Sequence, residues 1–327
     1  MRDTLVDLEV IKRAVRLACR APSLHNSQPW RWVVEGNRMH LYLDRKRILY
    51  ATDRAGHEAI ISCGAVLDHF SVAMAAAGWT AGVDRLPTAD DPDLLASIDF
   101  APIDFVTAAH RRWTEAILLR RTNRHPFAPP MQWTSVGAQL HSAVNTDAVR
   151  LDVLSDDARA ELKEASLLTE SLRLYDNSYH SELDWWTAPY PASEGIPYSS
   201  LVPRDCGDQV DVGRSFPAPH HQGPCGDIPA DYSKIVVLST YGDSHEDALR
   251  CGEVLSSVLL RCTVAGLATC TLTHITELRA SRRIIADLIG QDTTPQVLVR
   301  VGVAASKANL LPATPRRPLA EVLIVRR

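Results

Sequence analysis

The sequence predicts an α+β fold in which one chain carries two similar halves. Apolar residues recur with helical spacing in some segments and with the period of a strand in others. A segment that begins at His57 resembles a second one that begins at His245. The chain has 327 residues, of which 46% are apolar and 23% charged. This length allows two domains, and this composition is typical of globular proteins rather than disordered ones.

An internal repeat relates the two halves. When the sequence is shifted by 188 positions, HEAIISCGAVL from His57 overlays HEDALRCGEVL from His245 without a gap. The identical pairs are His57/His245, Glu58/Glu246, Cys63/Cys251, Gly64/Gly252, Val66/Val254, Leu67/Leu255, Ala77/Ala265 and Gly78/Gly266. Average residue usage gives roughly one or two identities over such a window. The alternative is a chance likeness of two apolar helices, but helical periodicity does not explain the His-Glu and Cys-Gly matches.

The repeat therefore favours a duplicated unit, with halves at residues 1–110 and 111–327. Each copy predicts a buried helix, a glycine at its end and then a strand, at residues 79–86 in the first half and 267–272 in the second. One chain would then carry both halves of what is otherwise a two-fold symmetric dimer, and we expect a monomer.

The remaining segments continue the alternation of helices and strands. Leu8 to Arg20 predicts an amphipathic helix that ends before Pro22. Residues 30–34 and 39–43 alternate around Glu35-Gly36-Asn37-Arg38, which predicts a hairpin. Further helices are expected at 108–122, 156–185 and 277–289, and further strands at 149–154, 235–240 and 296–302.

Charge and composition exclude several classes of function. The formal net charge is −4, so no overall electrostatic attraction favours a nucleic-acid partner. The N-terminus lacks the apolar core of a signal peptide. The longest apolar run, Val66 to Trp79, is interrupted by Asp68 and His69 and falls short of a membrane span. We therefore expect a cytoplasmic protein without a membrane partner.

The cysteines and histidines do not predict a metal site. Five of the seven cysteines lie among apolar residues and are expected to be small buried hydrophobes: Cys19, Cys63, Cys251, Cys262 and Cys270. His57-Glu58 and His245-Glu246 begin like zinc motifs, but the second histidine of such motifs is missing from both. His220-His221 are expected to face solvent, with metal binding as the alternative. Neither a glycine-rich nucleotide motif nor a GxSxG elbow is present.

One long segment, Thr187 to Asp231, is rich in Pro, Gly, Ser and Asp and has no period. Loops of this length are lids, binding loops or disordered segments. Because Trp185, Trp186, Tyr190, Tyr198 and Phe216 lie in or beside it, we expect a packed, lid-like insertion.

Three polar segments are candidates for binding a phosphorylated aromatic group. The first is APSLHNSQPW from Ala21, whose amides and hydroxyl suit the polar edge of a heterocycle; the alternative is an ordinary turn. The second is RRTNRHPF from Arg120, whose guanidinium groups suit a dianionic phosphate; the alternative is a solvated basic helix end. The third is Pro315-Arg316-Arg317-Pro318, which alone is only a basic tail.

Together these segments resemble the FMN-dependent nitroreductase-like family. The first segment is similar to the family's flavin-contact turn, and RRTNRHPF is similar to its phosphate-binding opening. Gly266-Leu267-Ala268-Thr269-Cys270 resembles the family's GLGTCW strand, and the segment at Pro315 its closing basic segment. The resemblance covers nearly the whole chain except 187–231. It implies a three-layer α/β/α fold and FMN as cofactor.

The order of the motifs differs from that of an ordinary family member. There the arginine motif opens the subunit and the NSQPW turn follows, whereas here each half has kept one of the two. In the second half, Ala143-Val144-Asn145-Thr146-Asp147 stands where the turn would be. The chain is thus similar to fused, single-chain members of the mycobacterial Acg type.

The resemblance implies one FMN site per chain, built from both halves. Ser23, Asn26 and Gln28 would face the isoalloxazine, and the ribityl chain and phosphate would be held by Arg120, Thr122, Arg124, Arg316 and Arg317. Arg121, Gly266 and Thr269 are further expected cofactor-binding residues. The pseudo-symmetric second site would be empty.

The resemblance also implies NAD(P)H as electron donor and a small-molecule nitroaromatic or quinone as acceptor. It identifies no side chain as an obligatory acid or base. One alternative is a protein that stores or sequesters FMN under a closed lid. A second alternative is a scaffold that has lost the flavin and binds another partner.

Overall fold

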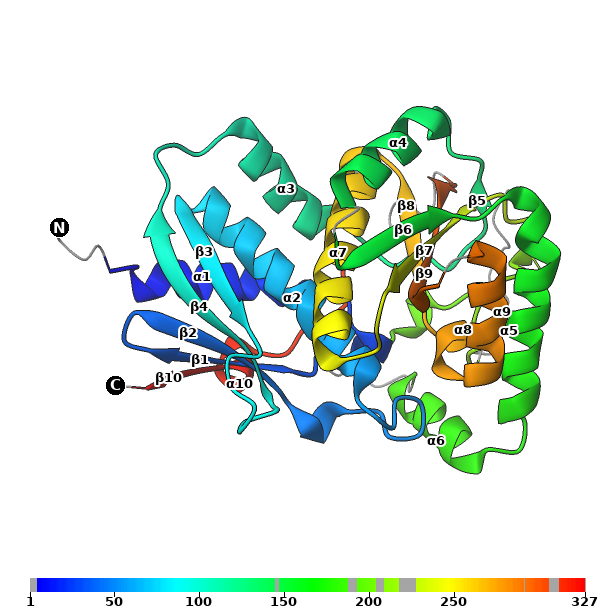
Figure 1. Ribbon diagram of the computed structural model, residues 1–327, viewed down its shortest axis with the longest axis horizontal. Helices are drawn as coiled ribbons and strands as arrows, with labels where there is room; N and C mark the ends of the chain where they lie inside the picture. The colour runs from blue at the N-terminus through cyan, green and yellow to red at the C-terminus, as the bar shows by residue number, and fades with distance from the viewer. Residues whose placement is uncertain are drawn as a thin grey trace. The chain divides into compact units, whose positions relative to one another are not determined.

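Antiparallel strand pairs form the centre of two units in the computed structural model, which describes residues 5–144, 147–187, 193–203, 209–217, 228–290, 292–305 and 312–326. Unit 1 contains residues 1–120, 244–260 and 315–327, and unit 2 contains residues 121–243 and 261–314. Helices and sheets occur in both, which confirms the α+β prediction (Figure 1). The units differ from the sequence halves 1–110 and 111–327 because residues 244–260 and 315–327 pack with N-terminal residues.

The sheet of unit 1 has the strand order β10-β1-β2-β4-β3. Its strands are β1 (Trp30–Glu35), β2 (Arg38–Leu43), β3 (Trp79–Arg85), β4 (Leu94–Pro102) and β10 (Leu323–Arg326). Neighbours are antiparallel, except that β10 runs parallel to β1. The expected hairpin is confirmed: β1 and β2 pair in register, and Gly36 between them takes a φ of 59°, which two-residue hairpin turns favour.

The helices of unit 1 surround one core helix. They are α1 (Leu8–Ala18), α2 (His57–Ala76), α3 (Ala108–Leu119), α10 (Leu319–Val322), the first turns of α7 (His245–Val264), and the short 3-10 helices η1 (Leu24–Asn26) and η2 (Arg45–Arg47). α2 packs against α1 and α3. The ring of Phe70 on α2 lies 5.0 Å from that of Trp32 on β1, and both are fully buried. A helix that is apolar on every side is typical of a core position.

α2 begins at His57, as the repeat predicts, and its 20 residues make it longer than the apolar run from Val66 to Trp79 that was compared with a membrane span. By length and composition it passes as a membrane span, alone among the helices of the described residues. However, 72% of its most apolar stretch of 18 residues is buried inside the protein. Such burial is a common property of core helices.

α2 and α7 approach each other at two glycines that the repeat places at equivalent positions. A Cβ atom added to Gly64 would lie 2.0 Å from the carbonyl oxygen of Leu249, and one added to Gly252 would lie 2.0 Å from that of Ile61. Leu249 and Gly252 are 188 positions after Ile61 and Gly64, so equivalent backbone atoms meet. Only glycine permits this approach, because any side chain would overlap a carbonyl group.

The sheet of unit 2 contains β5 (Phe127–Ala128), β6 (Val149–Val153), β7 (Lys234–Thr240), β8 (Ala268–Leu272) and β9 (Thr294–Ala304). All pairs are antiparallel, in the order β5-β9-β7-β6 with β8 also paired to β9. The path β6-β7-β9-β8 therefore has the same order as β1-β2-β4-β3 in unit 1. A duplicated unit predicts this equality.

The helices of unit 2 are α4 (Trp133–Val144), α5 (Arg159–Arg173), α6 (Asn177–Trp186), α8 (His274–Glu277) and α9 (Arg279–Ile289), with 3-10 helices η3 (Asp156–Ala158) and η4 (Tyr198–Ser200). α5 packs against α8 and α9. The prediction of a single helix at 156–185 is wrong, because the helix is interrupted between α5 and α6. The Asp176 carboxylate accepts a hydrogen bond of 3.0 Å from the Tyr179 N–H and so starts a new helix.

The Asp176 cap gives a first testable prediction. Asp176→Ala should lower the free energy of unfolding by about 1 kcal/mol, the usual value of such a cap. Urea denaturation of the full chain measures this, with Ser178→Ala, an exposed position on the same helix, as the control. Equal stability of the two variants would show that the cap does not hold α6.

The described part of the 187–231 segment is packed within unit 2, as expected, and its lid-like role stays a prediction. Ile196, Leu201 and Val212 are buried in it. Arg214 forms a buried ion pair with Glu277. Tyr190 and His220-His221 lie outside the described residues.

The five cysteines expected to be buried are buried and free. Burial raises the pKa of Cys19 and of Cys262 to about 12, so both thiols stay protonated at neutral pH. Their role is therefore packing.

Candidate functional site

The turn after α1 has an unusual backbone. Five non-glycine residues of the described chain have a positive φ, and three lie here: His25 at 47°, Asn26 at 59° and Gln28 at 52°. Each such conformation costs roughly 1–3 kcal/mol, and it is retained mainly at functional sites. The sequence motif and the backbone thus point to the same turn.

Side chains of this turn hold the C-terminal segment. The Asn26 amide donates to the Pro315 carbonyl oxygen at 3.2 Å, and the Gln28 amide oxygen accepts from the Arg317 N–H at 2.9 Å. The Gln28 amide nitrogen donates to the Asn26 carbonyl, and Ser23 Oγ accepts from the Gln28 N–H. Four predicted site residues are thereby brought together, although Gln28 is fully buried and both ends of its amide bind protein groups.

Two predicted arginines converge on the end of α1. Arg316 donates to the carbonyl oxygens of Cys19 at 2.7 Å, Arg20 at 3.1 Å and Ala21 at 3.2 Å. Arg120 also donates to the Arg20 carbonyl, at 3.1 Å. These carbonyl groups belong to the C-cap residue Cys19 and to the two residues after it, and cations at this end of a helix also interact favourably with its dipole. Both guanidinium groups therefore stabilise the turn on which Ser23 lies.

Arg317 is held by carboxylates instead. Its guanidinium lies 3.7 Å from Asp44 and 3.3 Å from Glu321, and its side chain is only 9% exposed. It also donates to the Gln28 carbonyl oxygen at 3.3 Å. These contacts make Arg317 a support of the turn.

The arginine motif in unit 2 continues into the sheet. Thr122 forms a parallel bridge with Thr269, and the Asn123 N–H donates to the Thr269 carbonyl oxygen at 2.9 Å. Gly266 is exposed and takes a φ of 75° just after α7, where it ends the helix. The structure thus brings Thr122 and Thr269 together and gives Gly266 a backbone role.

Arg124 has the environment expected of an anion-binding side chain. It is half-buried, its guanidinium lies 5.1 Å above the ring of Phe216, and it donates to the Ser200 carbonyl oxygen at 3.3 Å. Among the described residues no carboxylate lies within ion-pair distance of it. Burial lowers the pKa of Arg124, and the charge of Arg214 lowers it further.

A half-buried guanidinium without a carboxylate is costly, because its charge has lost part of its water and gained a carbonyl oxygen and an aromatic ring but no counter-ion. A bound phosphate would remove this cost through charge-assisted hydrogen bonds. Burial also lowers the pKa of Arg121. The motif therefore presents cations that suit a dianion.

A buried histidine, His69, lies in the same unit as Arg120 and Arg316 and is affected by their charges. In unit 1, His69 Nδ1 is 2.7 Å from Ser256 Oγ, and Ser256 donates to the Asp68 carboxylate. Burial, and then the charges of Arg120 and Arg316, hold the pKa of His69 well below its usual range. His69 is therefore neutral at neutral pH.

This neutral histidine predicts a dependence of stability on pH. Below about pH 6.5 His69 binds a proton in the unfolded chain but stays neutral in the folded chain. The free energy of unfolding should therefore decrease by up to about 1.4 kcal/mol for each unit by which the pH is lowered. His69→Asn should remove that part of the slope in urea denaturation between pH 7.5 and 5. His274, whose pKa burial also holds well below its usual range, should keep its own contribution in this variant. Identical slopes in the variant and the native chain would contradict the assignment.

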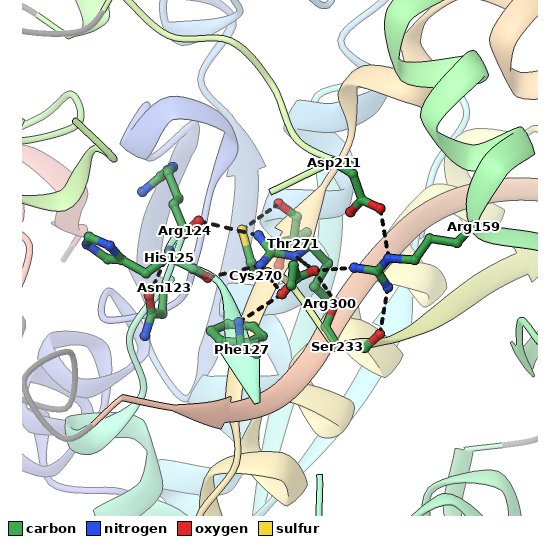
Figure 2. A network of polar contacts seen from close by, with 11 residues as sticks. Asn123, Arg124, His125, Phe127, Arg159, Asp211, Ser233, Cys270, Thr271 and Arg300 are labelled. Atoms are coloured by element: carbon green, nitrogen blue, oxygen red, sulfur yellow. Dashed lines mark hydrogen bonds and ion pairs between the residues drawn. The ribbon is translucent and has the colours of Figure 1, made fainter. Parts of the chain in front are cut away.

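The sequence did not point to a group of polar residues behind the arginine motif. Figure 2 shows Arg300 next to Arg124, His125 and Phe127, with Arg159 on its far side. Arg300 donates to the His125 carbonyl oxygen at 2.9 Å and to that of Arg124 at 3.4 Å. One sequence signal for it existed: an arginine in the otherwise apolar strand VLVRVG requires a buried partner.

The described residues contain no group of three or more His, Cys, Asp or Glu side chains arranged to bind a metal ion. The interpretation of His220-His221 concerns residues outside that part of the chain.

Comparison with known proteins identifies the family. No family model matches the chain. A Mycobacterium tuberculosis protein named "Putative NAD(P)H nitroreductase acg" is 60% identical over 326 residues, which cover 100% of this chain and 98% of that protein. A second protein of that organism, "Putative NAD(P)H nitroreductase Rv3131", is 35% identical over 326 residues, covering 97% of this chain and 92% of its own length.

Among solved structures, one described as a putative nitroreductase from Anabaena variabilis has a TM-score of 0.50 at 8% identity, covering 90% of this chain and 73% of that one. This likeness concerns the fold, which it identifies as the nitroreductase fold. Since the two M. tuberculosis relatives span nearly the whole chain, the chain belongs to the nitroreductase family, in the group that includes the mycobacterial protein acg.

Proposed function

We propose that the protein binds FMN and uses it as an NAD(P)H-dependent oxidoreductase that reduces small nitroaromatic or quinone-like acceptors. The observation that carries this proposal is the desolvated guanidinium of Arg124, which has no carboxylate partner among the described residues. The phosphate of FMN is the kind of anion that such a group binds. Relatives named NAD(P)H nitroreductase support the choice of electron donor.

In this proposal Arg124, Arg121 and Thr122 bind the phosphate, with Thr269 beside them on β8. Ser23, Asn26 and Gln28 form the turn for the isoalloxazine, and Arg120, Arg316 and Arg317 keep that turn in its strained conformation. Gly266 ends the helix before the Thr269 strand. The contacts of these side chains within each unit support these roles.

FMN, when bound, supplies the hydride and two-electron chemistry. The side chains of this chain bind and orient it. Cationic groups also favour an anionic ligand electrostatically, and the strained turn keeps its backbone donors fixed for binding. We assign no side chain as general acid or base.

We further propose that the chain arose by duplication and binds one FMN, with residues from both sequence halves, as a monomer. The equal strand orders and the glycine pair of α2 and α7 support this proposal. The retention of the NSQPW turn in one half only, and of the arginine motif in the other half only, supports a single site.

The test is anaerobic mixing of the FMN-loaded full chain with NADH or NADPH, followed by the flavin absorbance. The proposal expects bleaching within the time of a catalytic turnover and recovery on addition of a nitroaromatic compound. Bleaching by dithionite alone would reject NAD(P)H-dependent turnover.

One observation favours a second candidate function, the sequestration of FMN. Ser200 and Phe216, both from the 187–231 segment, already contact the Arg124 guanidinium. A segment that covers the phosphate-binding group in this way would slow the exchange of ligands. Sequestration predicts a flavoprotein that dithionite reduces and nicotinamides do not.

A further inference from the structure

The backbone of the arginine motif is held from behind by one buried side chain. Arg300 on β9 is 1% exposed, and its guanidinium donates to the carbonyl oxygens of Arg124 and His125. The same guanidinium lies 4.8 Å above the ring of Phe127. Arg300 therefore contacts the motif at three positions: the backbone carbonyl groups of Arg124 and His125 and the ring of Phe127.

Asp231 in turn holds Arg300. Its two carboxylate oxygens accept from Arg300 Nε at 3.0 Å and Nη2 at 2.7 Å, a bidentate pair with both side chains buried. They also accept from the Phe127 N–H at 2.8 Å, from Ser233 Oγ at 2.6 Å and from Arg159 Nη2 at 2.6 Å. The Asp231 carboxylate is thus bonded to the motif in two ways. It binds the Phe127 N–H directly, and it binds Arg300, which in turn binds carbonyl groups of the motif.

The charges of this network balance one another. Arg159, which also pairs with Asp211 at 2.9 Å, and Arg300 are neutralised by the two aspartates. Burial alone would raise the pKa of Asp231. The charge of Arg300 and the hydrogen bonds that the Asp231 carboxylate accepts outweigh burial, so the pKa of Asp231 is lowered. Both carboxylates of the network are therefore paired with Arg159 and Arg300, and neither forms an ion pair with Arg124.

We propose that Asp231 is a positioning residue for phosphate recognition: through Arg300 and the Phe127 N–H it sets the backbone from which Arg124 reaches the phosphate of FMN. This inference rests on the proposed function, and Figure 2 shows the arginines and Phe127 that take part. Asp231 is also the last residue of the 187–231 segment. The segment and the phosphate-binding motif are therefore anchored by the same carboxylate.

The test compares the affinities of the full chain for FMN and for riboflavin, which lacks the phosphate. Asp231→Asn keeps the shape of the side chain but removes its charge and one acceptor position. Loss of a charge-assisted contact corresponds to roughly tenfold or more in affinity. We expect the preference for FMN over riboflavin to fall by roughly that factor, with riboflavin affinity unchanged.

Asp152→Asn is the matched control, because it breaks the Arg150–Asp152 pair on β6 of the same unit, away from the motif. It should leave the preference for FMN unaltered. Ser233→Ala removes only one hydrogen bond to Asp231 and should give a smaller fall, which keeps the test available should Asp231→Asn fail to fold. The ³¹P NMR shift of bound FMN should move in Ser233→Ala and stay fixed in Asp152→Asn.

A merely structural role would lower the melting temperature and leave the ratio of the two affinities and the ³¹P shift as in the native chain, which would overturn the inference alone. A native chain that binds FMN no better than riboflavin would overturn the phosphate site itself, and the inference with it. The two failures are therefore distinguishable.

Discussion

Gly64→Ala should destabilise the fold by about 3 kcal/mol or more, the largest loss of stability that we expect from adding one methyl group. The added Cβ would lie 2.0 Å from the carbonyl oxygen of Leu249 and 2.8 Å from Cα of Gly252. Both obstacles are backbone atoms, so no side-chain rotation relieves the overlap and the two helices must separate. Urea denaturation of the full chain measures the loss, or the yield of soluble protein if unfolding is complete.

Gly252→Ala should have an effect of the same size, because its Cβ meets the carbonyl oxygen of Ile61 at the same distance. Gly82→Ala on β3 is the control, since its nearest neighbour is 3.7 Å away, an ordinary contact. If Gly64→Ala were as stable as Gly82→Ala, the close approach of α2 and α7 would be disproved.

Arg124→Ala should weaken FMN binding by roughly 10- to 100-fold, the value of a hydrogen bond or ion pair to a charged group. The expected cause is loss of the cation that faces the phosphate without a competing carboxylate among the described residues. Equilibrium titration of flavin-free protein, followed by flavin fluorescence, measures the effect. Stability should not fall correspondingly, because removing a desolvated charge also removes its cost.

Arg124→Lys should retain part of the affinity, since it keeps the charge and loses the planar, two-pronged geometry. Arg283→Ala, an exposed arginine on α9 of the same unit, is the control and should bind FMN as the native chain does. Unchanged FMN affinity in Arg124→Ala would remove the phosphate role.

Local patterns predicted much of the fold. Alternation around Gly36 predicted the β1–β2 hairpin, and the repeat predicted α2 with β3 and α7 with β8. The break between α5 and α6 was missed, because the cap at Asp176 competes with a helical pattern on both sides. β4 was also missed, since LLASIDFAP lacks a clean alternation of apolar and polar residues.

The candidate site was predicted in its parts but not in its contacts. The spacing of RRTNRHPF indicated cations, and the structure adds that Arg124 lacks a carboxylate partner among the described residues. No local pattern indicates that Arg316 binds carbonyl groups at the end of α1, because that contact joins residues 297 positions apart. The Asp231–Arg300 pair joins residues 69 positions apart, so no local pattern indicates it either.

The most direct test of the account is the calorimetric titration of the flavin-free full chain with FMN and, separately, with riboflavin. The account predicts one FMN per chain, bound more tightly than riboflavin because of the phosphate. No binding, two equivalent FMN per chain, or equal affinities for the two flavins would contradict it.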